Sequence, residues 1–264
     1  MGHGRDRTPG CCYARAKPSR SARRPRVQDQ PTAFFLSGEA IRSRSLGGIV
    51  LAQNLVLPAV PAQLGADWER DVARLGMAPG EVEALSIART RARWREYATC
   101  VQALAAWLDS LGLTDALAAG EVAIMACRGA RYHHDAVQYG DTAFCNLFLS
   151  EDRGLDLHLP GAGRRIRLQR GCAVLFDTAQ PHAVVPRAAS GFREGDFAAG
   201  ADCTQVFLSW ELPIEDARMA RALGVEFDVD PTTAARLGEA QVRLGKAKAE
   251  VDPTTGQWRG PPAS

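Results

Sequence analysis

Two of the chain's five histidines stand in a pattern that could bind a metal. His133 and Asp135 form a His-x-Asp pair, and His182 follows at a distance. On a strand, residues i and i+2 point to the same face, so His133 and Asp135 can converge on one ion. A third ligand from a neighbouring strand would complete one triangular face of an octahedral metal and leave the opposite face open. Two imidazoles and one carboxylate in this arrangement are typical of non-haem Fe(II) sites.

The segment around these residues has the pattern of short strands. After Gly120, apolar runs alternate with Gly, Asp and Pro, and turn sequences separate them. Several short strands at this spacing favour an antiparallel sandwich or barrel. The predicted strands cover 121–130, 131–135, 143–150, 155–159, 164–168, 172–176, 183–185 and 204–212.

Helices are predicted on both sides of this strand-rich segment. Residues 66–75 form a short helix, and apolar positions at steps of three and four predict a long helix over 81–111. The long helix should pack on the outer face of one sheet. A helix is also expected over 214–223, and Asp230 followed by proline predicts an N-cap for a last helix that ends near Glu250. An early strand lies within 47–58.

Composition restricts the class of protein. The chain has 264 residues, of which 46% are hydrophobic, and its net charge of +2 gives no global field that favours nucleic acid. Its seven cysteines show no paired spacing, which indicates buried thiols in a reducing compartment rather than disulfides. No apolar run is long enough for a membrane span or a signal peptide. We therefore expect a cytoplasmic protein with no membrane partner.

The chain divides into three parts by composition. Residues 1–30 are rich in Arg, Ser, Gly and Pro with few large aliphatic side chains, and are predicted to form a disordered basic tail. Residues 31–251 are predicted to form a single domain that includes the flanking helices. Residues 252–264, with several Pro and Gly, are expected to form a loose C-terminal tail.

The stretch from Tyr132 to Trp210 resembles the Fe(II)- and 2-oxoglutarate-dependent oxygenases, and specifically their prolyl-hydroxylase-like branch. Three pieces carry the resemblance: the His133-x-Asp135 pair, the run Arg170-Gly-x-Ala-Val-x-Phe-Asp177 that leads to Pro181-His182, and the continuation His182-x-Val-x-Pro186. The resemblance implies a mainly β fold whose double-stranded β-helix (jelly-roll) core packs on N-terminal and C-terminal helices.

The same resemblance implies the cofactors and their ligands. His133, Asp135 and His182 would bind Fe(II). With O2, the protein would couple oxidative decarboxylation of the cosubstrate 2-oxoglutarate to hydroxylation of a small-molecule substrate that the sequence does not identify.

In the family, an Arg or Lys shortly after the distal His binds the far carboxylate of 2-oxoglutarate. Arg193 lies eleven residues beyond His182, and its planar guanidinium suits a carboxylate. Counted back from Trp210, however, the expected basic position falls near residues 204 and 205. Arg187 and Arg131 therefore remain alternatives, Arg131 because on a regular strand it would share the inward face with His133.

Three other interpretations stay open. A cupin-like metalloprotein shares the jelly roll but normally places His-x-His in the first metal strand, where this chain has His133-His134-Asp135. A non-catalytic jelly-roll module that binds a metal or a ligand is the main alternative. A demethylase of nucleic-acid bases would explain the basic tail, but 187–193 reproduces only the outer arginines of that branch, so nucleic acid is not an expected partner.

Four polar residues near the pattern are interpreted separately. His134 points away from the predicted site, and both His134 and His158 are interpreted as structural or surface residues, with a substrate-facing position on a neighbouring strand as the alternative for His158. Asn146 either faces the metal from its strand or makes a strand-end hydrogen bond. Asp177 is interpreted as a turn residue or as a carboxylate that orients a ligating imidazole.

Overall fold

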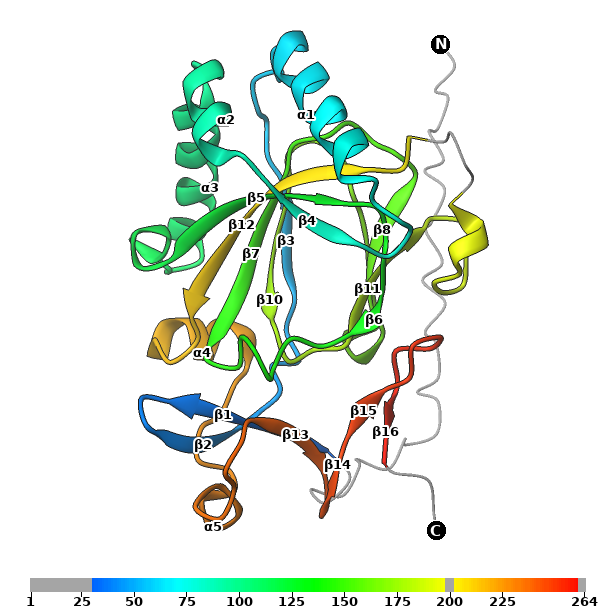
Figure 1. Cartoon of the computed structure of the whole chain (residues 1–264). Helices are drawn as coiled ribbons and strands as arrows, with labels where there is room; N and C mark the ends of the chain where they lie inside the picture. Colours follow the sequence, from blue (N-terminus) through cyan, green and yellow to red (C-terminus); the bar gives the residue numbers. More distant parts are fainter. Residues whose placement is uncertain (1–29, 198–201, 261–264) are drawn as a thin grey trace, which may run out of the picture.

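The protein is mainly β, with several antiparallel sheets and helices packed against them (Figure 1). The computed structural model describes residues 30–197 and 202–260. The predicted basic tail, 1–30, lies outside this range except for its last residue. The described part contains five α-helices: α1 (Ala62–Leu75), α2 (Ile87–Arg93), α3 (Tyr97–Ser110), α4 (Ala217–Leu223) and α5 (Pro231–Ala234).

The described strands form four sheets, all antiparallel. The largest has the order β3-β10-β7-β12-β5-β4, a second has β6-β11-β8-β9, a third has β14-β13-β1-β2, and β15 pairs with β16. The strands are β1 (Pro31–Ser37), β2 (Ala40–Ser45), β3 (Leu51–Asn54), β4 (Val82–Leu85), β5 (Glu121–Cys127), β6 (Ala130–His133), β7 (Thr142–Phe148), β8 (Leu155–Leu159), β9 (Arg164–Arg167), β10 (Cys172–Asp177), β11 (His182–Pro186), β12 (Gln205–Pro213), β13 (Gln241–Leu244), β14 (Ala247–Lys248), β15 (Glu250–Val251) and β16 (Trp258–Arg259).

The eight strands from β5 to β12 are shared between two of these sheets. Strands β5, β7, β10 and β12 belong to the six-stranded sheet, and β6, β8, β9 and β11 belong to the second sheet. The chain therefore changes sheet at every connection except the one between β8 and β9. Neighbouring strands in space, such as β6 and β11, are distant in sequence, and this pairing brings separated residues together.

The six-stranded sheet is buried on both faces. Because alternate side chains point to opposite faces of a strand, β12 contributes to two different environments. One set packs under the helices (Val206, Leu208, Trp210 and Leu212), and the other faces the second sheet (Phe207, Ser209 and Glu211).

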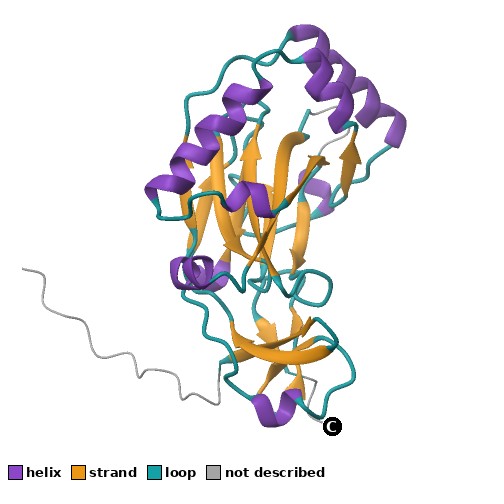
Figure 2. Cartoon of the chain, turned by 90° about the vertical axis from the view of Figure 1, so that its left-hand side faces the viewer, coloured by secondary structure: helices purple, strands orange, loops and turns teal. Residues whose placement is uncertain are grey.

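Helix α3 covers the outer face of this sheet, as the sequence predicted. Its buried residues Cys100, Leu104 and Leu108 belong to the same apolar cluster as Ile124 of β5 and Leu147 of β7. In Figure 2 the longer helices lie outside the strands at the upper end of the molecule. No helix in the described part of the chain is both long and apolar enough to span a membrane.

The single helix predicted over 81–111 is wrong. The chain forms edge strand β4, then two helices, α2 and α3. Strand β4 pairs with β5, and Ser86 then caps α2 by accepting a hydrogen bond from the amide of Arg89. Trp94 is extended and almost fully buried, so it separates α2 from α3. Helical spacing of apolar residues continued across this break and concealed it.

The last predicted helix, over 230–250, is also wrong beyond its first turn. Asp230 does cap α5 by accepting a hydrogen bond from the Thr233 amide, but α5 ends at Ala234. The chain then forms β13, which pairs with β1, and turns at Gly245 (φ +61°) into β14. Within the predicted loose tail, 252–264, the described part contains strand β16 paired with β15.

Candidate metal centre

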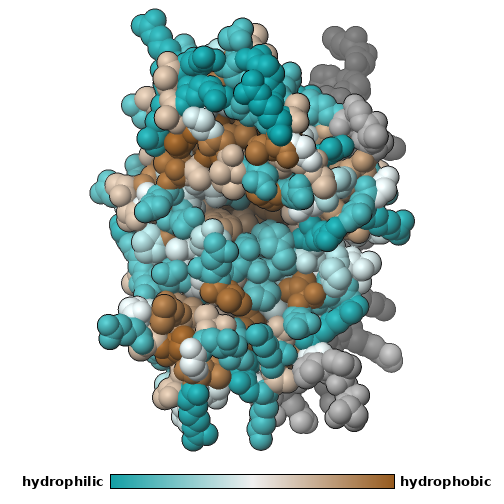
Figure 3. Space-filling model, in the orientation of Figure 1, coloured by the Kyte–Doolittle hydropathy of each residue, from teal (hydrophilic) through white to brown (hydrophobic). Residues whose placement is uncertain are grey.

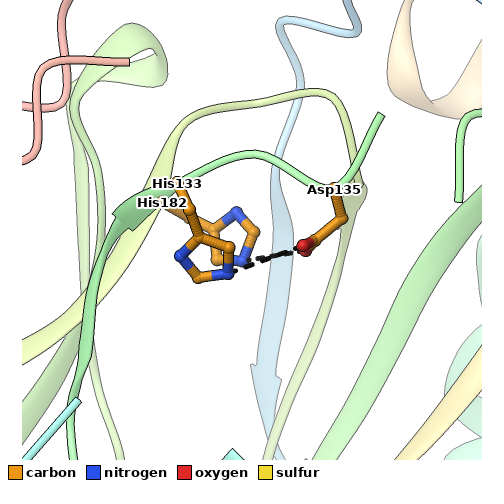
Figure 4. Close-up of side chains that lie close together, drawn as sticks. All are labelled: His133, Asp135 and His182. Atoms are coloured by element: carbon orange, nitrogen blue, oxygen red, sulfur yellow. Dashed lines mark ion pairs between the residues drawn. The ribbon is translucent and has the colours of Figure 1, made fainter. Parts of the chain in front are cut away.

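The side chains of His133, Asp135 and His182 lie close together (Figure 4). They line a space between the six-stranded sheet and the β6-β11-β8-β9 sheet, which are called the two central sheets. The Nε2 atom of His133 lies 3.6 Å from Oδ1 of Asp135, and the Nε2 atom of His182 lies 3.5 Å from its Oδ2. One ligand atom from each of the three residues lies within 4.8 Å of the others. Metal bonds of about 2.1 Å would place such atoms about 3 Å apart, so a small closure completes a site.

Both imidazoles are held with one ring nitrogen free to bind a metal. The Nδ1 atom of His133 lies 2.7 Å from the carbonyl oxygen of Arg131, and Nδ1 of His182 lies 2.9 Å from that of Gln180. A carbonyl oxygen only accepts hydrogen bonds, so each Nδ1 donates. The proton is thereby placed on Nδ1, and the Nε2 lone pair is directed toward Asp135. Metal-binding histidines are commonly oriented in this way.

A β-bulge in β6 aims His133 at the site. His182 pairs with His133 and Val184 pairs with Ala130, so two steps along β11 correspond to three along β6. In a regular strand, Ala130 and His133 would point to opposite faces. The extra residue turns both toward the space between the sheets, as bulges commonly do near functional sites. His133 is the last residue of β6, so the predicted strand 131–135 is too long.

Asp135 follows the strand in a loop that the β10–β11 turn holds in place. Its amide donates a hydrogen bond to the carbonyl oxygen of Thr178 at 2.9 Å. The Thr178 hydroxyl in turn donates to the carbonyl oxygens of Tyr139 and Thr142. The same turn leads directly into His182, so one short segment positions two of the three candidate ligands.

A buried ion pair stabilises the turn between β10 and β11. Arg44 of β2 donates two hydrogen bonds to the Asp177 carboxylate, at 2.7 and 2.8 Å, and both side chains are fully buried. The carboxylate also accepts from the amides of Gly47 and Ala179. Asp177 therefore has the turn role, one of the two roles predicted for it. Its carboxylate forms no hydrogen bond with an imidazole of the described residues.

A cavity of about 340 Å³ adjoins the three candidate ligands. Figure 3 shows apolar side chains gathered around a hollow below α1, on the face where β4 and β5 border the cavity. The exposed fraction of the ligand side chains rises from 8% at His182 to 41% at His133, so one side of the centre is accessible to solvent. The walls of the cavity include Phe144, Asn146, Phe148, Phe176, Phe207 and Glu211.

Burial determines the charge state of the groups in the cavity. Desolvation, with a smaller contribution from His133, lowers the pKa of His182 to about 4, so this imidazole is neutral at pH 7 and its Nε2 lone pair is available. Desolvation also raises the pKa of the Glu211 carboxyl, and the nearby Glu121 and Asp141 raise it further.

The three arginines predicted to bind 2-oxoglutarate all lie outside the cavity lining. Arg187 forms ion pairs with Asp152 and Asp156 at 2.8 and 3.0 Å, away from the candidate ligands. Arg131 is exposed and pairs with a glutamate, and Arg193 is exposed. The bulge removes the reason for choosing Arg131, because it does not share the inward face with His133. The assignment of these three arginines to 2-oxoglutarate binding stays a prediction, and their positions do not support it.

The other polar residues are placed as follows. The His134 ring packs against Trp258, and the Nδ1 atom of His158 forms a hydrogen bond with the Tyr132 hydroxyl. Neither histidine lines the cavity. Asn146 does line the cavity, and its side-chain oxygen is buried without a hydrogen-bond partner among the described residues. Its inward direction agrees with one of the two alternatives that the alternation of β7 predicted.

The residues present fit one of the two implied cofactors better than the other. The three ligand atoms, the neutral buried imidazole and the oriented Nδ1 groups fit Fe(II). For 2-oxoglutarate the fit fails at the far carboxylate, because no Lys or Arg of the described chain lines the cavity.

Comparison with known proteins finds solved structures of similar fold, and these include oxygenases. No protein-family model and no curated protein matches the sequence. Among solved structures, viral collagen prolyl hydroxylase vCPH from Paramecium Bursaria Chlorella virus-1 is 9% identical, with coverage of 62% of this chain and 88% of its own and a TM-score of 0.36. EvdO2 from Micromonospora carbonacea var. aurantiaca is 14% identical, with coverage of 65% and 89% and a TM-score of 0.37.

A third similar structure is the non-heme alpha ketoglutarate dependent epimerase SnoN from nogalamycin biosynthesis. It is 11% identical, with coverage of 64% of this chain and 78% of its own and a TM-score of 0.32. The structural neighbours thus include 2-oxoglutarate-dependent oxygenases at low sequence identity.

Proposed function

We propose that this protein is a non-haem Fe(II)-dependent oxygenase that uses a 2-oxo acid as cosubstrate. The observation that carries the proposal is the convergence of two Nε2 atoms on the Asp135 carboxylate, with each Nδ1 atom bonded to a backbone carbonyl. We further propose that strands β5–β12 are the double-stranded β-helix implied by the sequence resemblance, since they alternate between two facing sheets.

The chain's own residues would bind the metal and shape its surroundings. His133, Asp135 and His182 would hold Fe(II) on one face and leave coordination positions free on the other, toward the cavity. Fe(II) held in this way supplies oxidative chemistry with O2. The aromatic walls at Phe144 and Phe176 limit water around the centre.

The proposal extends to substrate and location. The cavity is small enough to favour a small-molecule substrate rather than a macromolecule. The buried thiols Cys100, Cys127, Cys145 and Cys172 agree with the proposed reducing, cytoplasmic location.

Metal binding tests the proposal directly. Purified protein is titrated with Fe(II) under anaerobic conditions, and bound iron is measured after desalting. His182→Ala is expected to lower the affinity by more than about 100-fold, since even groups that only orient a ligand commonly contribute about 10- to 100-fold. His158→Ala is the matched control, because its imidazole lies outside the cavity, and it should bind Fe(II) as the wild type does.

An unchanged affinity in His182→Ala would contradict the proposed centre. Oxidative decarboxylation is then measured as CO2 release from a 2-oxo acid in the presence of Fe(II) and O2. Release by the wild type and not by His182→Ala would support the oxygenase. Fe(II) binding without any 2-oxo acid turnover would instead favour the non-catalytic, cupin-like module. The absence of Lys and Arg among the described residues that line the cavity makes that module a specific alternative.

A further inference from the structure

Among residues 30–197 and 202–260, no positively charged side chain lines the cavity beside the candidate metal centre. Apart from the three candidate ligands, the ionisable groups that line it are Glu211, Tyr139 and Cys127. A ligand with a second carboxylate would therefore place that charge in a neutral or acidic environment. Burying a carboxylate without a positive or hydrogen-bonding partner is strongly unfavourable.

Strand register divides the inner wall of the cavity into three levels. At the near level, Phe176 pairs with Phe144, and Phe144 pairs with Glu211. The Phe176 and His182 rings lie 5.0 Å apart, so the candidate metal centre is at this level. The middle level contains the pair of Asn146 and Ser209.

The far level is apolar and aromatic. Phe148 pairs with Phe207, and their rings stack with centroids 5.0 Å apart. Both side chains are almost fully buried. Strand β5 ends at Cys127 beside this level, and the facing sheet contributes Leu157 and Val184, which pair with each other. At this level β12 presents the aromatic Phe207 to the cavity and no cation.

The middle level offers neutral hydrogen-bonding groups. Asn146 is only 8% exposed, and its side-chain oxygen has no partner among the described residues. A buried amide without a partner is costly, and an asparagine provides both donors and an acceptor. Ser209 adds a hydroxyl at the same level. A ligand that extends from the metal would meet these polar groups first and the aromatic pair of Phe148 and Phe207 beyond them.

We propose that the 2-oxo acid bound in this cavity has an aromatic or branched aliphatic tail and is not the dicarboxylate 2-oxoglutarate. Its 2-oxo acid head would lie at the metal, and its tail would lie against Phe148, Phe207 and Leu157. This inference rests on the proposed function, because it assumes a metal that a 2-oxo acid can chelate. It deepens that function by naming the chemical class of the cosubstrate.

Binding of matched 2-oxo acids tests the inference without turnover. Anaerobic Fe(II)-loaded protein is titrated with phenylpyruvate, 4-methyl-2-oxopentanoate, 2-oxoglutarate and pyruvate, and the metal-to-ligand charge-transfer band is recorded. Phenylpyruvate and 4-methyl-2-oxopentanoate should bind at least about tenfold more tightly than 2-oxoglutarate, because only their tails match an apolar subsite. Pyruvate, which has the head without a tail, should also bind weakly.

Two variants should reverse the preference. Phe207→Arg places a cation at the far level, and Ser209→Arg places one at the middle level, where the strand is less buried and the substitution is easier to accommodate. Each should raise the affinity for 2-oxoglutarate relative to phenylpyruvate. Glu39→Arg, which introduces the same side chain at an exposed turn outside the cavity lining, should leave the wild-type preference unchanged.

The outcomes separate this inference from the proposed function. Equal or tighter binding of 2-oxoglutarate by the wild type would overturn the inference and leave the oxygenase proposal intact. Fe(II) binding with no response to any of the four acids would also overturn it, while the metal centre would stand. Failure to bind Fe(II) would overturn both.

Discussion

At the scale of single residues, the candidate centre depends on groups that do not touch it. The buried Arg44 connects β2 to Asp177, which precedes the turn that holds Asp135 through Thr178 and leads to His182. Breaking a buried ion pair by removal of one partner commonly costs about 3–5 kcal/mol, because the remaining charge stays buried without compensation. Arg44 is thus a positioning residue for the candidate ligands Asp135 and His182.

Arg44→Met should lower the free energy of unfolding by about 3–5 kcal/mol and weaken Fe(II) affinity. The double variant Arg44→Met with Asp177→Leu should regain part of the stability, because no charge is left buried. Its Fe(II) affinity should stay low, because the turn loses the four hydrogen bonds that the carboxylate accepts. Urea unfolding and iron titration measure the two effects.

Arg42→Met is the matched control for this prediction. Arg42 lies on the same strand and pairs with Glu215 and Asp228, but all three side chains are about one-third exposed or more. Exposed ion pairs contribute about 0–1 kcal/mol, so stability and iron affinity should change little. Equal losses in Arg42→Met and Arg44→Met would argue against a special role for the buried pair.

At the scale of elements, short features set the direction of the chain near the central sheets. The bulge in β6 turns His133 inward, and α4 packs Met219 and Leu223 onto the outer apolar cluster directly after β12. Asp216 is the N-cap of helix α4, and its carboxylate accepts a hydrogen bond from the Arg218 amide at 2.8 Å. The cap therefore stabilises the element that closes the sheet's outer face.

Asp216→Ala should lower stability by about 1 kcal/mol at pH 7. Hydrogen bonds from the Arg218 side chain, and then from its amide, lower the pKa of Asp216 to about 2. A carboxyl in the unfolded chain has a pKa of about 3.9, so the folded state binds its proton less readily. The stabilisation is fully present above about pH 4 and is lost as the pH falls toward about 2.

Urea unfolding at pH 7, 5 and 3 measures this dependence. The difference between wild type and Asp216→Ala should shrink at pH 3. Asp216→Asn retains a capping oxygen but binds no proton at this position, so its difference from Asp216→Ala should vary less with pH. A pH-independent difference between wild type and Asp216→Ala would show that the cap carboxylate does not titrate as expected.

At the scale of the whole molecule, two apolar clusters share the six-stranded sheet. Cys100 and Cys145 lie in the cluster under the helices, and Cys127 and Cys172 lie in the cluster between the sheets. Burial raises the pKa of Cys127 and Cys172 to about 12 and that of Cys100 to about 11. The thiolate is the reactive form, so these buried thiols report on unfolding of the cores.

Thiol labelling should test whether the predicted 31–251 domain unfolds as one unit. At pH 8 in the native protein, the half-exposed Cys203 should react quickly and the four buried cysteines slowly. With increasing urea, the two clusters should become reactive at the same midpoint, as measured by mass spectrometry of labelled peptides. Cys11 and Cys12 are replaced by Ser in the background used. Separate midpoints for the two clusters would contradict a single cooperative unit.

Much of the candidate centre was accessible from the sequence. The types of His133, Asp135 and His182 name the three residues that the structure brings together, because a side chain's ligand chemistry is intrinsic. Strand alternation does not explain how His133 meets Asp135, because Asp135 lies in a loop after β6. The same alternation predicted strands near β5–β12 and gave the inward direction of Asn146 as one of two alternatives. One error occurred at β4, where apolar spacing continued across the break, and another after α5, where a correctly predicted N-cap begins a helix of only four residues.

Only the tertiary structure decided what surrounds those three residues. The bulge in β6, the contact of Arg44 with Asp177 and the pairing of β1 with β13 join residues far apart in sequence, and no local pattern encodes them. Which strands face one another likewise decides that no described Lys or Arg lines the cavity. A sequence specifies side-chain chemistry and local periodicity, but long-range packing decides which side chains share a space and therefore which ligand fits there.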